Sequence, residues 1–144
     1  MKYSTRMALG VTVATIAVFA HSALSAEQAS LPPPEHSAKV TYLSGGIGSD
    51  QSAEIKQEMG KYSLVLEFAG HTSSGNDYLA DIPVQITDAH GKTVLATVTT
   101  GPFLLISMPD GHYTVTATYH GQVMHRNVDV RASSHSRAVF VWAM

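Results

Sequence analysis

The sequence contains no cysteine and only a small share of charged residues. None of its 144 residues is Cys, and 14% are Asp, Glu, Lys or Arg. Without cysteine the chain forms no disulfide bond, and it lacks the thiol to which a lipoprotein anchor is attached. The fold is therefore expected to depend on its buried apolar core alone.

A long apolar run occurs near the N-terminus. Lys2 and Arg6 flank the start of an almost continuous apolar stretch over residues 7–20, which is shorter than the roughly 20 residues of a membrane span. The small residues that follow are Ala20, Ser22, Ala23, Ser25 and Ala26. This order is typical of a secretory signal peptide, so we predict one over residues 1–26 and a periplasmic or secreted protein.

Cleavage is expected after Ala26. That position places Leu24 three residues before the cut, where a smaller side chain is preferred, so cleavage after Ser22 or Ala23 is an alternative. An uncleaved N-terminal anchor is a further alternative, which the short apolar run disfavours.

Basic residues are scarce in the part that would remain after cleavage. Loss of Lys2 and Arg6 lowers the number of Lys and Arg from 9 to 7, against 11 Asp and Glu, which gives a net charge of −4. A mildly acidic chain without a basic cluster is not typical of nucleic-acid-binding proteins. No second apolar stretch is long enough to span a bilayer, so we expect no transmembrane segment after cleavage.

Two segments are expected between the signal peptide and the main domain. Residues 27–38 are predicted to be a flexible, proline-rich linker, because Pro32, Pro33 and Pro34 favour extended polyproline geometry. Residues 39–61 are predicted to form a glycine-rich loop and one short helix.

The helix is predicted over residues 50–59. Ser49 or Asp50 is the expected N-cap, and Gly60 is the expected C-terminal stop. Its partly apolar face is expected to consist of Ala53, Ile55 and Met59.

Residues 62–144 are predicted to form a mostly β domain. Apolar and polar residues alternate in several short runs, and turn signals separate the runs. Residues 70–77 are predicted to be a polar loop. Many short strands at nearly even spacing favour a sandwich or barrel over a parallel sheet. The predicted strands, with one short strand before the domain, are residues 39–43, 62–68, 82–87, 93–99, 103–108, 112–120, 123–130 and 138–142.

The hairpin over residues 112–130 is expected to turn at Gly121 and Gln122, because glycine suits the first position of a type II′ turn. The resulting pairs are His120 with Val123, Thr118 with His125, Thr116 with Asn127 and Thr114 with Asp129. One face of the hairpin is then mostly polar, and the other is apolar except for Arg126.

The last predicted strand, residues 138–142, is apolar on both faces. Ala138, Phe140 and Trp142 alternate with Val139 and Val141. A strand of this kind is either covered on both sides or meets a partner.

Two turn patterns suggest a family. Asp88 to Gly91 has the form D-x-x-G, and Pro109 to Val115 has the form P-x-G-x-Y-x-V. With these patterns, residues 81–121 resemble the carboxypeptidase regulatory-like domain, which is related in fold to transthyretin and to the collagen-adhesin B-type repeats. Residues 42–48 also resemble a set of uncharacterised exported proteobacterial proteins that share this architecture.

The resemblance implies a seven-stranded Greek-key β-sandwich of the transthyretin-like, or prealbumin-like, type. Such domains are usually not catalytic. In metallocarboxypeptidases the domain is an accessory to a peptidase domain, and no peptidase domain accompanies it here.

The glycine-rich loop is the first candidate for a ligand or partner site. Gly45, Gly46 and Gly48 precede the predicted helix, together with Asp50. Backbone amides at a helix N-terminus attract anions, but the Walker lysine is missing and no βαβ unit follows. We favour the interpretation of this loop as a tight connection that packs the helix against the edge of the sandwich, and we regard it as the first place to look if a ligand or partner site exists.

Histidines and serines offer weaker candidates. His120 and His125 are expected to be diagonal neighbours, but His112 and Asp129 are expected to lie too far away to complete a metal site. Ser133, Ser134, His135 and Ser136 form a polar connection without the G-x-S-x-G pattern of a nucleophile elbow. We therefore predict no catalytic residue, no metal site and no cofactor.

The chain also contains the residue types that form an isopeptide cross-link. Lys61, Glu67 and Asn127 have the chemistry of an isopeptide bond assisted by an acid, as in adhesin-type relatives, but the sequence does not place them together.

Export, the resemblance and the lack of a reactive cluster favour a non-enzymatic module that binds a protein partner through surface contacts. The alternatives are a structural subunit of a cell-surface assembly, paired through its last strand, and a small metal-binding or hydrolytic periplasmic protein.

Overall fold

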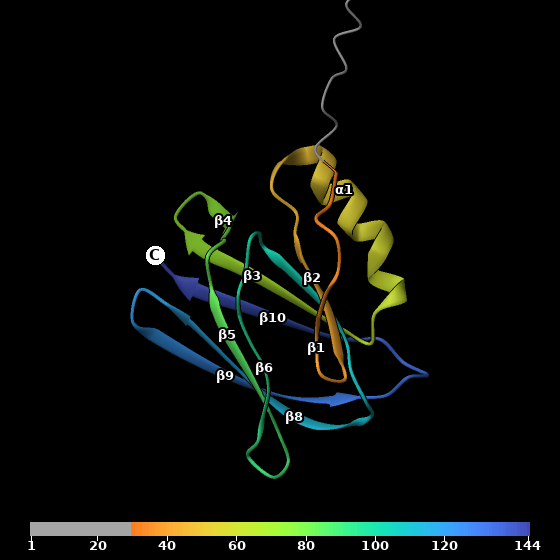
Figure 1. Cartoon of the computed structure of the whole chain (residues 1–144). Helices are drawn as coiled ribbons and strands as arrows, with labels where there is room; N and C mark the ends of the chain where they lie inside the picture. Colours follow the sequence, from red (N-terminus) through yellow and green to blue (C-terminus); the bar gives the residue numbers. More distant parts are fainter. Residues whose placement is uncertain (1–29) are drawn as a thin grey trace, which may run out of the picture.

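Two β-sheets pack against each other, and one helix lies on the outer side of the larger sheet (Figure 1). This computed structural model describes residues 30–144. The predicted signal peptide, residues 1–26, lies outside the described residues, as does the start of the predicted linker, residues 27–29.

The larger sheet has six strands in the order β1-β2-β7-β3-β10, and β4 also pairs with β3. Its neighbours run antiparallel except for β3 and β10, which are parallel. The strands are β1 (Glu35–Ser37), β2 (Val40–Gly45), β3 (Leu64–Thr72), β4 (Gly75–Tyr78), β7 (Phe103–Ser107) and β10 (Ser136–Ala143).

The smaller sheet has four antiparallel strands in the order β6-β5-β8-β9. Its strands are β5 (Pro83–Asp88), β6 (Thr93–Val98), β8 (Gly111–Tyr119) and β9 (Gln122–Val130). The helical segment is α1 (Gly48–Glu58), followed directly by the short 3₁₀ helix η1 (Met59–Lys61). No helix among the described residues is long and apolar enough to cross a membrane.

The predicted mostly β, sandwich-like arrangement is confirmed. Eight strands were predicted from the sequence pattern, and the described residues form ten. The short strand predicted over residues 39–43 corresponds to β2, which lies beside β7 in the larger sheet. β1 and β4 arose in segments for which no strand was expected.

β1 lies within the segment that was predicted to be a linker. Glu35–Ser37 pair with β2 across a tight turn in which Ala38 has a φ of 50°. The hydroxyl of Tyr42 donates a hydrogen bond to Glu35 Oε2 at 2.9 Å, and this bond raises the pKa of Tyr42. The prolines before this strand have no regular secondary structure, but the linker is shorter than expected.

β4 replaces the polar loop that was predicted over residues 70–77. β3 continues to Thr72, and the chain returns as β4 with Ala69 opposite Tyr78. The turn is held by Thr72 Oγ1, which lies 2.9 Å from the carbonyl oxygen of Gly75. This hairpin extends beyond the core, so its polar side chains reflect exposure to solvent and not the absence of a strand.

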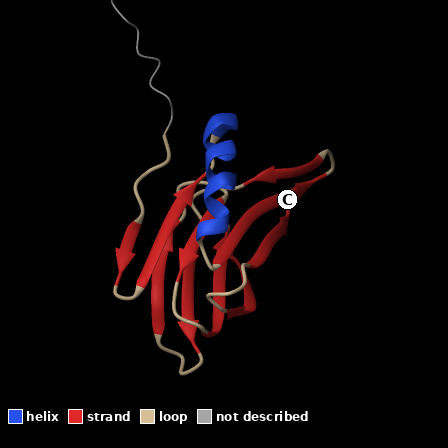
Figure 2. Cartoon of the chain, turned by 90° about the vertical axis from the view of Figure 1, so that its right-hand side faces the viewer, coloured by secondary structure: helices blue, strands red, loops and turns tan. Residues whose placement is uncertain are grey.

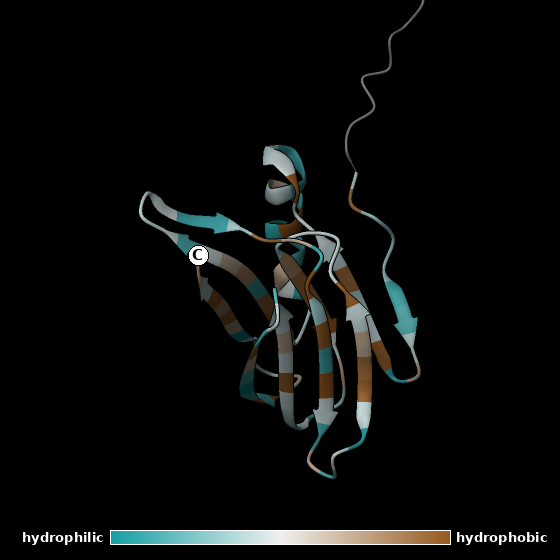
Figure 3. Cartoon of the chain, turned by 90° about the vertical axis from the view of Figure 1, so that its left-hand side faces the viewer, coloured by the Kyte–Doolittle hydropathy of each residue, from teal (hydrophilic) through white to brown (hydrophobic). Residues whose placement is uncertain are grey.

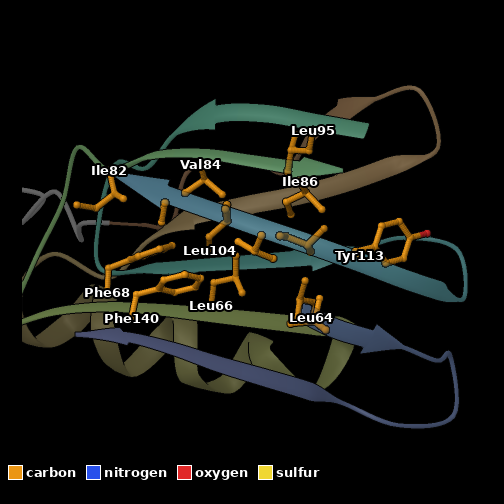
Figure 4. Packing of buried hydrophobic residues seen from close by; sticks show 14 of the residues in the cluster. Leu64, Leu66, Phe68, Ile82, Val84, Ile86, Leu95, Leu104, Tyr113 and Phe140 are labelled. Carbon is orange, nitrogen blue, oxygen red and sulfur yellow. The ribbon is translucent and has the colours of Figure 1, made fainter. Parts of the chain in front are cut away.

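The main core fills the space between the two sheets (Figure 4). Leu64, Leu66 and Phe68 of β3 face Val84 and Ile86 of β5, and all of these side chains are buried. Complete burial of a Leu, Ile or Phe side chain contributes about 1.5–3 kcal/mol, so this layer is the main source of stability. Figure 3 shows the alternation that produces the layer as bands of different hydropathy along the strands.

A second, smaller core fixes α1 to the outer side of the larger sheet (Figure 2). Ile55 of the helix is fully buried against a group of sheet residues. That group comprises Leu43, Tyr62, Val65, Phe103 and Leu105. Of the predicted apolar helix face, Ile55 and Met59 contact this core, but Ala53 is exposed.

The ends of the helix differ from the prediction. The N-cap residue is Ile47, and no side chain caps it, so the caps predicted at Ser49 and Asp50 were wrong. The helix starts at Gly48, and its last turn tightens into η1, which continues past Gly60 to Lys61.

The hairpin of β8 and β9 turns one residue earlier than predicted. Tyr119 pairs with Gln122, which leaves His120 and Gly121 as the turn residues, with φ values of 46° and 77°. Two positive φ angles define a type I′ turn, whereas the prediction assumed type II′. The predicted pairs were therefore wrong by two residues. A shift by two keeps every side chain on its predicted face.

β10 closes the side of the sandwich where the two sheets end. Phe140 and Trp142 point into the core, and Trp142 Nε1 donates a hydrogen bond to the carbonyl of Gln122 at 3.1 Å. The guanidinium of Arg126 lies over the Phe140 ring, which accounts for the one basic residue on the apolar side of β9.

Candidate functional site

The glycine-rich loop connects β2 to α1, and two of its backbone amides already have an acceptor. The amides of Gly46 and Ile47 donate hydrogen bonds to Oε1 of Gln51, at 2.9 and 3.1 Å. In addition, the hydroxyl of Ser52 donates to the carbonyl of Gly46 at 2.6 Å. The side chain of Gln51 thus takes the place that an anion would occupy in a phosphate-binding loop.

Close packing explains why glycine is needed in this loop. Gly46 has a φ of 103°, and a Cβ atom there would lie 2.5 Å from the ring of Phe103. Gly45 contacts the backbone of Gly101 so closely that a Cβ on Gly101 would lie 2.4 Å from it. The loop is therefore pressed against the start of β7.

The structure brings Gly45, Gly46, Gly48 and Asp50 to one end of the sandwich. Asp50 is exposed, and its nearest polar contact is the hydroxyl of Ser49 at 3.4 Å. A shallow, mostly apolar groove of about 510 Å³ runs along the loop. Its other walls include Tyr78, Leu79 and Pro102. The mostly apolar walls of this groove suit surface contact.

The histidines are distributed differently from the prediction. His112 contacts Asp129 through Nδ1, a pairing that was not predicted, since both residues had been assessed only by their distance from His120 and His125. His125 lies opposite Thr116, with its Nδ1 2.9 Å from Oγ1, and His120 lies in the turn, stacked on the ring of Tyr119. Among residues 30–144, no three His, Asp or Glu side chains are grouped as metal ligands would be.

The three residues considered for an isopeptide bond are occupied elsewhere. Lys61 forms an ion pair with Glu58 at 2.9 Å, and Glu67 pairs with Arg137. Asn127 accepts a hydrogen bond from Thr114 at 3.1 Å. Each of these groups has its own partner, so the arrangement does not favour a cross-link among them.

The polar connection before β10 has a structural role. Ser134 forms a bridge with Arg131, and Ser136 donates its hydroxyl hydrogen to the carbonyl of Asp129. His135 Nδ1 lies 2.8 Å from the carbonyl oxygen of Tyr62. These contacts fix the corner between β9 and β10.

An apolar patch lies on the outer face of the larger sheet, beside α1. Val141 of β10, Ala69 of β3 and Tyr78 of β4 form one cross-strand row. Tyr78 is 53% exposed, Val139 is 40% exposed and Val141 is 37% exposed. We call Tyr78, Val139 and Val141 the β10 patch.

The β10 patch lies between the groove along the glycine-rich loop and an ion pair. The ring of Tyr78 packs on Phe103, with centroids 5.3 Å apart, and therefore adjoins the groove along the glycine-rich loop. The ion pair of Glu67 and Arg137 borders the other end. The two-sided apolar pattern of β10 indicated part of this patch from the sequence. Tyr78 was missed because its segment read as a loop.

Comparison of the chain with models of protein families, with curated proteins and with solved structures gave no match.

Proposed function

We propose that this chain is an exported, non-enzymatic β-sandwich module that binds a partner protein through the β10 patch. Its place of action is the periplasm or the cell exterior, as the signal-peptide pattern of residues 1–26 indicates. The observation that carries the proposal is the gathering of Tyr78, Val139 and Val141 on one exposed face.

Exposed apolar side chains that form a contiguous patch with a polar rim are typical of protein interaction sites. The β10 patch combines an aromatic residue with two β-branched ones, and the ion pair of Glu67 with Arg137 lies at its border. Tyrosine is enriched where protein interfaces derive most of their affinity. Ala69, between Val141 and Tyr78 in the same row, and Phe103, against the Tyr78 ring, are both buried and adjoin the patch.

The strand order supports a finer proposal on the fold. We propose that β3 and β5–β10 form a Greek-key sandwich of the transthyretin-like type, in a carboxypeptidase regulatory-like domain. The order β6-β5-β8-β9 in one sheet and β7-β3-β10 in the other supports this assignment, as does the parallel pairing of β3 with β10. β1, β2, β4 and α1 are then additions to that domain.

The test is capture of the partner by tagged protein produced without residues 1–26, from the cell envelope of the native host. Val141→Lys places a charge in the centre of the β10 patch, whereas Thr116→Lys places one on the opposite sheet. A protein captured by the wild type and by Thr116→Lys, and lost with Val141→Lys, supports the proposal once direct binding of the purified pair shows the same difference. A capture pattern that does not change in Val141→Lys contradicts it.

A structural subunit is the second candidate function, because β10 is the outermost strand of the larger sheet over eight residues. An edge strand of this length offers backbone groups to a neighbouring chain. Analytical ultracentrifugation of the wild type separates the two functions. Concentration-dependent oligomers that Val139→Lys abolishes favour assembly, and a monomer at the highest concentration favours the binding module.

A further inference from the structure

The outer face of the four-stranded sheet is the second large exposed surface of the molecule. β5 and β6 each direct three side chains to this face, and β8 and β9 each direct four, all of them exposed or half-buried. At one end of the face, His112 of β8 lies opposite Asp129 of β9. We call the remaining part of the face the threonine face. It consists of Pro83, Gln85, Thr87, Thr93, Ala96, Val98, Thr114, Thr116, Thr118, Val123, His125 and Asn127.

The residues of the threonine face are aligned in rows across the sheet. Ala96, Gln85, Thr116 and His125 form one row, each opposite the next. Thr93, Thr87, Thr114 and Asn127 form the adjacent row. Because side chains in a row stand about 4.8 Å apart, the surface presents a regular array of hydroxyl, amide and methyl groups.

The threonine face contains no Asp, Glu, Lys or Arg. This is unusual, since charged residues are normally exposed and strands commonly carry them on their solvent side. The next pair on the same side of β8 and β9 is His112 with Asp129, which contact each other at the edge of the threonine face. A surface without charge does not attract nucleic acids or charged small molecules, which depend on electrostatic contacts.

The polar side chains of the threonine face are fixed by hydrogen bonds across the strands. Gln85 Nε2 donates to Thr93 Oγ1 at 2.8 Å. Thr114 Oγ1 donates to Asn127 Oδ1 at 3.1 Å. These bonds leave Oε1 of Gln85 and Nδ2 of Asn127 without a partner among residues 30–144. Side chains that are already ordered lose little entropy when they bind a ligand.

Composition argues against a protein occupant. Protein interfaces depend on Tyr, Trp, Phe, Met and Arg for much of their affinity, and none of these residues belongs to the threonine face. A second copy of the chain is disfavoured for the same reason.

A neutral, hydroxyl-rich chain fits the threonine face. A groove of about 510 Å³ runs over β5, β6 and β8, where Gln85 and Thr116 lie beside Ala96 and Val98. Hydroxyl and amide groups match the hydrogen-bonding groups of a sugar, and the methyl groups match its C–H surfaces. We propose that the threonine face binds an uncharged polysaccharide.

The test is a titration of ¹⁵N-labelled protein, produced without residues 1–26, followed by amide chemical shifts. Cellohexaose, maltohexaose and chitohexaose are the neutral probes, and heparin is the anionic one. We expect at least one neutral probe to shift amides of β5, β6 and β8 saturably, and heparin to leave them unchanged. Shifts elsewhere, equal shifts with heparin, or no saturable shift with any of the three neutral probes would overturn the proposal.

Two variants locate the site. Thr116→Lys places a long charged side chain in the row that also contains Gln85 and His125. We expect this variant to bind the polysaccharide at least about tenfold more weakly. Gln57→Lys places the same charge on an exposed position of α1, away from both candidate surfaces, and is expected to bind as the wild type does. Equal binding by Thr116→Lys and wild type overturns the proposal, as does capture of a protein that Thr116→Lys alone loses. The fold of each variant is checked by its amide spectrum.

Discussion

The guanidinium of Arg126 lies over the ring of Phe140, with its central carbon 5.6 Å from the ring centroid. Arg126 belongs to β9 of the smaller sheet, and Phe140 belongs to β10 of the larger one. This contact therefore joins the last strands of the two sheets on the side where no backbone ladder connects them.

Replacement of Arg126 by Ala is expected to lower the free energy of unfolding. The variant loses the cation–π contact and the packing of the arginine stem, together about 0.5–1 kcal/mol at a site open to solvent. Urea denaturation measures the change, with Arg131→Ala as a control for loss of an exposed positive charge on the same side. Equal stability of the two variants would show that the Phe140 contact contributes nothing.

Replacement of Gln51 by Ala is expected to destabilise the protein by about 1–2 kcal/mol, because two amide donors at the start of α1 lose their acceptor. Gln51→Glu keeps an acceptor and adds a negative charge near the helix N-terminus, so it is expected to retain stability. Gln57→Ala, on an exposed position of the same helix, is the control. A loss in Gln51→Ala no larger than in the control would contradict this role.

Two glycines of the same loop are expected to respond differently to a methyl group. Gly46→Ala places its Cβ 2.5 Å from the Phe103 ring at a φ of 103°, whereas Gly48→Ala has a φ of 79° and open space around it. We expect a loss of about 1 kcal/mol for Gly48→Ala from backbone strain alone, and at least about 1 kcal/mol more for Gly46→Ala from the added clash. Thermal unfolding of both variants provides the comparison. Similar losses of stability in the two variants would mean that the Phe103 ring moves aside without an energetic penalty.

Alkaline pH is expected to destabilise the protein through Tyr113. Burial raises the pKa of this phenol, with smaller contributions from the carboxylates of Asp88 and Asp110, and its hydroxyl donates to the carbonyl of Pro109 at 2.7 Å. The folded chain therefore holds the proton more tightly than the unfolded chain. The resulting stability is present below about pH 10, the ordinary pKa of tyrosine, and is lost as the pH rises through the folded value.

Denaturation curves measured from neutral pH to above pH 10 test this expectation. Tyr113→Phe is expected to be about 1 kcal/mol less stable at neutral pH, because it loses the bond to Pro109. Above pH 10 its stability is expected to fall less steeply than that of the wild type. Tyr78→Phe removes an exposed hydroxyl and is the control. A parallel decline in wild type and Tyr113→Phe would exclude Tyr113 as the source.

Alternation in the sequence was sufficient to locate most strands of the sandwich. The pattern of Leu64, Leu66 and Phe68 predicted the buried face of β3, because a period of two separates core from solvent. It did not predict that Val65, on the other face, is also buried. That burial depends on Ile55 of α1, which reaches the outer face of the sheet only in the folded chain.

Turn chemistry was harder to infer than strand position. A glycine at position 121 is compatible with the first position of a type II′ turn and with the second position of a type I′ turn. The structure has the second arrangement, and His120 accepts a positive φ. β4 was missed for a different reason, since Asn76 and Asp77 lie in a hairpin that projects beyond the core and shows no apolar alternation.

The candidate surfaces were predictable only in part. Val139 and Val141 indicated from the sequence that β10 has a second apolar face. The position of Tyr78 in the same row depends on the pairing of β4 with β3. The sequence suggested an anion at the glycine-rich loop but did not predict that Gln51 accepts the amide hydrogen bonds there. A side chain that folds back onto a loop has no characteristic sequence spacing.

The parallel pairing of β3 with β10 joins Leu64 to Ser136, which are 72 residues apart in the sequence. Loop closure over such a distance makes folding slow compared with that of a protein built from local contacts. A chain that leaves the ribosome N-terminus first exposes β3 before β10, so Phe68 stays without the neighbouring rings of Phe140 and Trp142 until β10 emerges. The order of the strands therefore makes the pairing of β10 with β3 a late step in folding.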